Sequence, residues 1–153
     1  MPTLTALLQQ IEDYLQYHEK ANPTVSKSTV GWQLDHSLLV IIGIVNQLEQ
    51  SNPENYQWRP NWKRTYIQLR NSIPRGKAKA PKLVRPLETA SLDDLQSKLA
   101  AAKEKTALLQ SLPANSYFTH PYFGDLNLKS AIWFLKLHTN HHLKIVNDIL
   151  NKG

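Results

Sequence analysis

Apolar residues recur at steps of three and four along four stretches of the chain, the spacing that gathers side chains on one face of an α-helix. The pattern predicts helices over residues 3–19, 28–50, 91–112 and 128–149. The second stretch is also apolar on the face opposite its main stripe, so we expect it to be the central helix. Its main stripe is Leu34, Leu38, Ile41, Val45 and Leu48. Four helices of similar length predict an all-α fold, a four-helix bundle.

Helix-breaking residues separate these stretches. Asn22-Pro23, Ser51-Asn52-Pro53 and Pro113 each end a helical pattern. A shorter helix is expected over residues 61–71, with Trp62, Tyr66 and Leu69 on one side. Ser91 and Asn127 are suited to cap the helices that follow them. Residues 114–126 show no β alternation of useful length, and we expect a loop there.

The composition narrows the class of protein. With 153 residues, 41% of them hydrophobic, the chain is expected to form one globular domain over residues 1–153. It has no cysteine, so it forms no disulfide and offers no thiolate. The longest apolar run, 38–45, is too short to span a bilayer, and the first residues lack the basic start of a secretion signal. We therefore expect a cytoplasmic protein with no membrane partner.

The formal net charge of +6 has its excess in a segment that contains no acid. This segment also holds Pro74, Gly76, Pro81 and Pro86, so a long basic loop is predicted from residue 72 to about Thr89. A solvated loop is the simplest interpretation. Alternatively, Arg75, Lys77 and Lys79 could close over an anionic substrate. Nucleic acid is not the expected partner, because no aromatic residue interrupts the run to stack on bases. The basic residues are Arg70, Arg75, Lys77, Lys79, Lys82 and Arg85.

Two histidines occupy the apolar stripe of the last helix. His138 and His142 are one turn apart, so both rings point the same way. A divalent metal would satisfy both lone pairs, and without cysteine its remaining ligands must be histidine, carboxylate or water. The alternative is a pair of core histidines that hydrogen-bond to the backbone or to water. The stripe comprises Leu128, Ala131, Leu135, His138, His142, Ile145 and Ile149.

The residues alone leave the third ligand open. His36 lies on the second face of the central helix, beside apolar neighbours, and His18 ends the stripe of the first helix. His141, His120 and Asp35 are weak candidates for acid–base catalysis. No Ser-His-Asp spacing and no glycine-rich phosphate loop is present.

The chain resembles the DinB/YfiT-like superfamily of four-helix bundles over nearly its whole length. The resemblance is carried by Trp32-Gln-Leu-Asp-His36, by His120-Pro-Tyr-Phe-Gly124, and by Trp133 with His138-Thr-Asn-His-His142. The last two are similar to a branch with HPxFG and HxxHH motifs, although Ile145 stands where that branch often has glutamine. The resemblance implies a three-histidine metal site formed by His36, His138 and His142, with Zn or Ni as the ion and Fe as a further option.

The resemblance also implies a class of activity. We expect a metal-dependent enzyme, either a transferase that uses a low-molecular-weight thiol or a hydrolase, acting on a small anionic substrate. The alternative is a non-catalytic stress-response or binding module whose histidine cluster is structural or vestigial. A nucleic-acid binder that uses residues 70–85 is the weaker third hypothesis. A homodimer is compatible with a helical bundle, but the sequence shows no interface.

Overall fold

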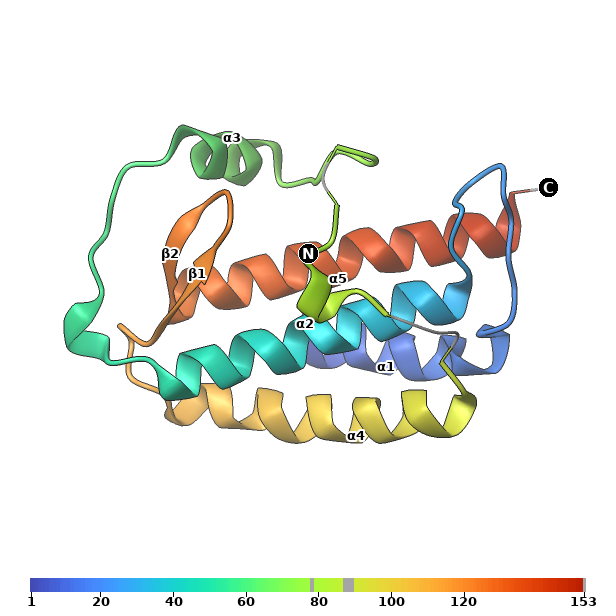
Figure 1. The fold of residues 1–153 in the computed structure, drawn as a ribbon, viewed down its shortest axis with the longest axis horizontal. Helices are drawn as coiled ribbons and strands as arrows, with labels where there is room; N and C mark the ends of the chain where they lie inside the picture. Colours follow the sequence, from blue (N-terminus) through green and yellow to red (C-terminus); the bar gives the residue numbers. More distant parts are fainter. Residues whose placement is uncertain (78, 87–89, 153) are drawn as a thin grey trace.

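Four long helices pack side by side in the computed structural model, which describes residues 1–77, 79–86 and 90–152 (Figure 1). Helices α1 and α2 each contact both α4 and α5, so the four surround one core. Short 3₁₀ turns extend α1 over Leu15–Tyr17 and α4 over Leu109–Ser111, and another follows α2 at Pro53–Asn55. The four helices are α1 (Leu4–Tyr14), α2 (Val30–Gln50), α4 (Leu92–Leu108) and α5 (Leu128–Asn151).

The central position predicted for α2 is confirmed. All five members of its predicted stripe are buried, and so is Val40 on the other face. Thr29 caps its first turn by accepting a hydrogen bond from the Trp32 amide. Because α2 contacts both α4 and α5, each of its two faces meets a neighbouring helix.

The expectation of a plain loop over residues 114–126 is wrong. Strands β1 (Tyr117–His120) and β2 (Gly124–Asn127) form an antiparallel hairpin there, with His120 opposite Gly124. Four-residue strands are too short to show a clear alternation. Gly124 adopts a positive φ of 69°, which favours glycine at the point where the chain re-enters the sheet. Asn127 then caps α5, as predicted, through the Ser130 amide.

The predicted short helix is present as α3 (Trp62–Arg70). It lies outside the four long helices, beyond the hairpin (Figure 1). Arg64 donates hydrogen bonds to the carbonyl oxygens of Arg59 and Phe123, which joins α3 to the hairpin. Only Arg64 and Ile67 of this helix are buried.

The predicted basic loop follows α3 and contains one 3₁₀ turn, Lys82–Val84. Ala78 and the end of the predicted loop, residues 87–89, lie outside the described residues. Within the described part, Arg75 forms an ion pair with Asp148 of α5 at 2.8 Å. The loop is therefore attached to the helix that carries two of the candidate ligands.

Candidate metal centre

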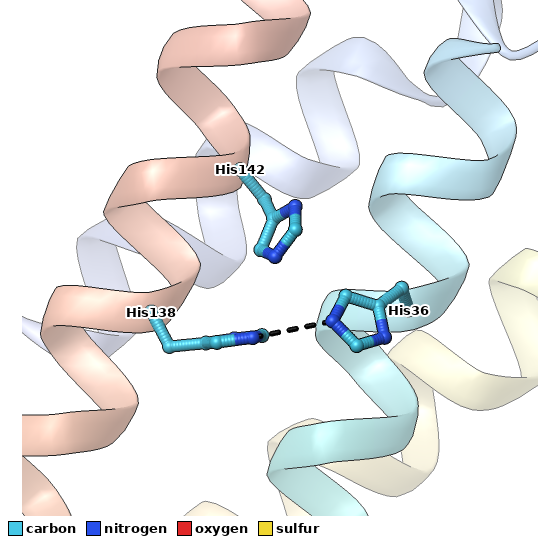
Figure 2. Close-up of side chains that lie close together, drawn as sticks. All are labelled: His36, His138 and His142. Carbon is cyan, nitrogen blue, oxygen red and sulfur yellow. Dashed lines mark hydrogen bonds between the residues drawn. The ribbon is translucent and has the colours of Figure 1, made fainter. Parts of the chain in front are cut away.

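Three histidines from two helices converge in the interior, between α2 and α5. His36 lies two turns into α2, and His138 and His142 lie on consecutive turns of α5 (Figure 2). One ring nitrogen from each residue lies within 4.8 Å of the other two. Because α2 packs directly on α5, the helix spacing itself brings the rings together.

The closest approach is between His36 and His138. Their Nε2 atoms are 3.2 Å apart, and the two rings meet edge to face. Two nitrogens bound tetrahedrally at about 2.0–2.1 Å from one zinc ion would be about 3.3–3.4 Å apart. Three neutral imidazoles are also a donor set that suits Zn, Ni, Fe and Cu. The residues present therefore fit a divalent metal ion.

Hydrogen bonds at Nδ1 fix the orientation of two of the rings. His36 Nδ1 donates to the backbone carbonyl of Val84 at 2.6 Å, and His142 Nδ1 donates to the side-chain carbonyl of Gln33 at 2.6 Å. A carbonyl oxygen only accepts, so in both neutral rings the proton is on Nδ1 and the lone pair is on Nε2. Such partners commonly orient histidine ligands of metals. Nε2 is thus the available donor atom in both residues.

Gln33 is in turn held in place by its neighbour Ser26. Its amide nitrogen donates to the Ser26 hydroxyl oxygen at 3.3 Å, which turns the amide oxygen toward His142. The side chain is almost completely buried. Sequence reasoning missed this residue, although a polar side chain three residues before His36, on the same face of α2, was an available signal.

His138 differs from the other two histidines. Its Nδ1 is buried and has no hydrogen-bond partner among the residues that the structure describes. The ring is held instead by packing, with Phe134 at 5.5 Å and His142 at 4.5 Å between ring centroids. An unpaired buried nitrogen costs about 1–3 kcal/mol, so this position is destabilising as it stands.

Burial keeps the three rings neutral. It holds the pKa of His138 and His142 well below the ordinary value of 6.5, and the neighbouring histidines lower both further. Burial also lowers the pKa of His36, although the Val84 carbonyl and the nearby Asp35 carboxylate oppose the shift. Neutral rings keep the lone pairs that a metal needs.

Of the three weak catalytic candidates, His141 directly contacts a member of the cluster. Its ring is perpendicular to that of His142, with centroids 5.1 Å apart. Burial lowers its pKa to about 4, and the positive charges of Arg75 and Lys144 add to the shift. His141 is therefore neutral at neutral pH.

The other two candidates have structural partners. His120 stacks on Phe123, and its Nδ1 accepts hydrogen bonds from the Tyr122 and Phe123 amides, which closes the hairpin turn. Burial lowers its pKa to about 4. Asp35 is buried rather than on the surface, and it accepts a hydrogen bond from Lys98 of α4 at 2.7 Å. Asp35 therefore points to α4 and not into the cluster.

The remaining sequence-predicted residues lie outside the cluster. His18 bonds the Leu15 carbonyl at the end of the first helix, the expected role for a helix-end histidine. Arg75 is engaged with Asp148, and Lys77 and Lys79 are exposed. The basic loop contributes the Val84 carbonyl instead, a contact that sequence reasoning did not foresee. An open hollow of about 710 Å³ beside α3, lined by Asn61, Arg64 and Asp125 among others, includes none of the three histidines.

The structure is therefore that of a mostly helical protein with a histidine cluster between two packed helices. A family model described as the DinB superfamily matches residues 3–146. The chain belongs to the DinB superfamily. No curated protein and no solved structure matches it. Within the described ranges, no helix is both long and apolar enough to cross a membrane.

Proposed function

We propose that the chain is a four-helix-bundle metalloenzyme in which His36, His138 and His142 hold one divalent ion, Zn or Ni. The observation that carries the proposal is the convergence of three ring nitrogens within 4.8 Å, two of them with the proton fixed on the opposite nitrogen. When bound, such an ion supplies Lewis acidity to a coordinated water or thiol. Three protein ligands would leave coordination positions for these molecules.

The surrounding residues supply orientation and a dry environment. Gln33 and the Val84 carbonyl hold the imidazole protons away from the ligand side. Trp32 stacks on His36 with centroids 5.1 Å apart, and Phe134 packs against His138, so apolar rings limit water on two sides. His141, whose ring centroid lies 5.1 Å from that of His142, adds a further neutral imidazole beside the site.

The proposed reaction is transfer to or from a low-molecular-weight thiol, with hydrolysis of a small anionic substrate as the other reaction. Because the chain has no cysteine, any sulfur ligand must come from a substrate. Lys77 and Lys79, which are exposed on the basic loop, are the proposed contacts for a substrate carboxylate, together with Arg75 if it leaves Asp148.

One observation favours a non-catalytic module instead. The 3.2 Å contact between His36 and His138 satisfies both Nε2 atoms if His138 donates, without any metal. A binding or stress-response module with a structural cluster would then use its surface for function.

The test is to load the metal-free protein with Ni²⁺ or Co²⁺ and to add a small thiol. A thiolate-to-metal absorption band in the near ultraviolet, lost in His142→Ala and kept in His18→Ala, is expected. Thiol transfer and ester hydrolysis are then assayed with the same preparations. A loaded protein that neither binds thiol nor turns over either substrate class would favour the non-catalytic module.

A further inference from the structure

The outer side of α3 carries a stripe of large apolar side chains that the other described residues leave exposed. Trp62, Tyr66 and Leu69 are 76%, 50% and 84% exposed, and their spacing of four and three residues places them on one helix face. Tyr122 at the hairpin turn is 50% exposed and adjoins this face, because Lys63 Nζ lies 5.8 Å from the Trp62 ring and 5.6 Å from the Tyr122 ring. We call these four residues the outer stripe.

The surroundings of the outer stripe are strongly basic. Half of the 18 lysines and arginines fall between Tyr56 and Pro86, where there is no acid. Lys63 and Arg70 of α3 are exposed, and Arg70 donates a hydrogen bond to the Tyr66 hydroxyl. Two acids, Glu54 and Asp125, line the hollow beside α3 together with the buried Arg64. The outer face therefore combines exposed apolar surface with positive charge.

We propose that the outer stripe and its cations dock on the surface of an anionic lipid bilayer. A helix with tryptophan, tyrosine and leucine on one side and basic residues beside them is suited to lie in the interface plane. Trp and Tyr favour the headgroup level, and anionic lipids attract cations that lie close to the surface. This proposal replaces the sequence-based expectation of no membrane partner. It is independent of the metal site and concerns surface attachment, not spanning.

Two other occupants fit the observations less well. A symmetric second copy would bring identical basic patches together, and like charges across an interface are unfavourable. A single-stranded nucleic acid would need open ring faces for stacking, but Lys63 already lies against the Trp62 and Tyr122 rings. The aliphatic Leu69, the most exposed of the four, offers a base nothing to stack on.

The test is co-sedimentation of the full chain with vesicles of equal parts phosphatidylglycerol and phosphatidylcholine, and with vesicles of phosphatidylcholine alone. Binding to the anionic vesicles only is expected, and it should weaken as salt is raised. The double variants Trp62→Ser/Leu69→Ser and Lys63→Glu/Arg70→Glu should each lower the partition coefficient about tenfold or more. The controls are Tyr17→Ser/Leu108→Ser and Lys20→Glu/Lys27→Glu, which make comparable aromatic, aliphatic and charge changes at exposed positions elsewhere.

Further measurements distinguish lipid docking from nucleic-acid binding and from self-association. Circular dichroism should show that all four variants fold, since every substituted residue is exposed. Absence of vesicle binding by the wild type, or equal losses in the test and control variants, would overturn the proposal. Binding of a single-stranded oligonucleotide in place of vesicles would assign the face to nucleic acid. A dimer in sedimentation that dissociates in Trp62→Ser/Leu69→Ser, without vesicle binding, would assign it to self-association.

Discussion

A neutral amide, rather than a carboxylate, orients one of the three clustered histidines. Gln33 accepts the Nδ1 proton of His142 and is itself anchored by Ser26. A carboxylate in this place would add negative charge and raise the basicity of the ligand. The amide fixes the ring without adding charge to a buried site.

Replacing Gln33 should therefore weaken metal binding without removing a ligand. Gln33→Leu is expected to lower the affinity for Zn²⁺ or Ni²⁺ by about 10-fold to 100-fold, because His142 loses the partner that sets its tautomer. Competition titration against a chelating dye measures the change. Gln47→Leu makes the same substitution at an exposed position of the same helix and should leave the affinity unchanged. Equal affinities in the two variants would contradict a positioning role for Gln33.

The buried histidines also make stability depend on pH. Burial lowers the pKa of both His120 and His141 to about 4, whereas an unfolded chain titrates near 6.5. Between these values the unfolded state binds protons that the folded state does not, so the free energy of unfolding should fall as the pH falls from about 6.5 to about 4. The three clustered histidines shift in the same direction.

Urea unfolding of the metal-free protein at about pH 7 and about pH 4.5 measures this dependence. His141→Gln should remove part of it, because one of the shifted groups is lost. A metal-free protein whose stability is the same at both pH values would contradict the burial of these rings.

Among the secondary-structure elements, the regular spacing of apolar residues made the helices predictable. The hairpin was not predicted, because each of its strands has only 4 residues. The stripe of α2 repeats over four turns, so chance alternatives are few, and its buried residues follow the prediction. The β1–β2 hairpin depends on one positive φ at Gly124 and on the His120 side chain accepting two turn amides. Neither the backbone angle of the glycine nor the hydrogen bonds of the histidine leave a periodic signal in the sequence.

The connection before α2 depends on a close backbone approach at Gly31. Its amide donates to the His18 carbonyl at 2.7 Å, and a Cβ at this position would lie 2.8 Å from the same oxygen. Gly31→Ala is therefore expected to destabilise the fold by about 1–3 kcal/mol, a typical cost of overpacking. Chemical denaturation measures the change.

Gly43 of the same helix provides the control. Among the described residues its added Cβ would meet only Val84, at 4.0 Å, so Gly43→Ala should stabilise the helix by about 0.5–1 kcal/mol. A Gly31→Ala variant as stable as Gly43→Ala would show that the backbone contact is not tight.

At the scale of the whole molecule, contacts between distant segments assemble the candidate site. His36 and His142 could be named from sequence, but the Val84 carbonyl comes from a loop 48 residues after His36. A backbone atom has no residue signature, so no pattern could have selected it. The residues alone likewise could not choose His36 over His18, because His36 lay on an apolar face of one helix and His18 ended the apolar stripe of another; helix packing brings only His36 to the cluster.

The net charge is distributed unevenly along the chain. Outside residues 56–86, nine lysines and arginines face twelve aspartates and glutamates, so the net positive charge belongs to α3 and the loop after it. From the sequence we placed the excess charge between Arg70 and Arg85, and the exposed Lys63 extends it along α3. Residues 56–86 thus include both the Val84 carbonyl, which orients His36, and the exposed face of α3 that is proposed to dock on lipid.

The central claim is that His36, His138 and His142 hold one metal ion, and metal content tests it most directly. Protein purified without an affinity tag is analysed by plasma mass spectrometry, beside His138→Ala and the control His18→Ala. About one Zn or Ni per chain is expected in the wild type and the control, and most of it should be lost in His138→Ala. A wild type that contains no metal and binds none when Zn²⁺ or Ni²⁺ is added, or a His138→Ala variant that retains full metal, would contradict the claim.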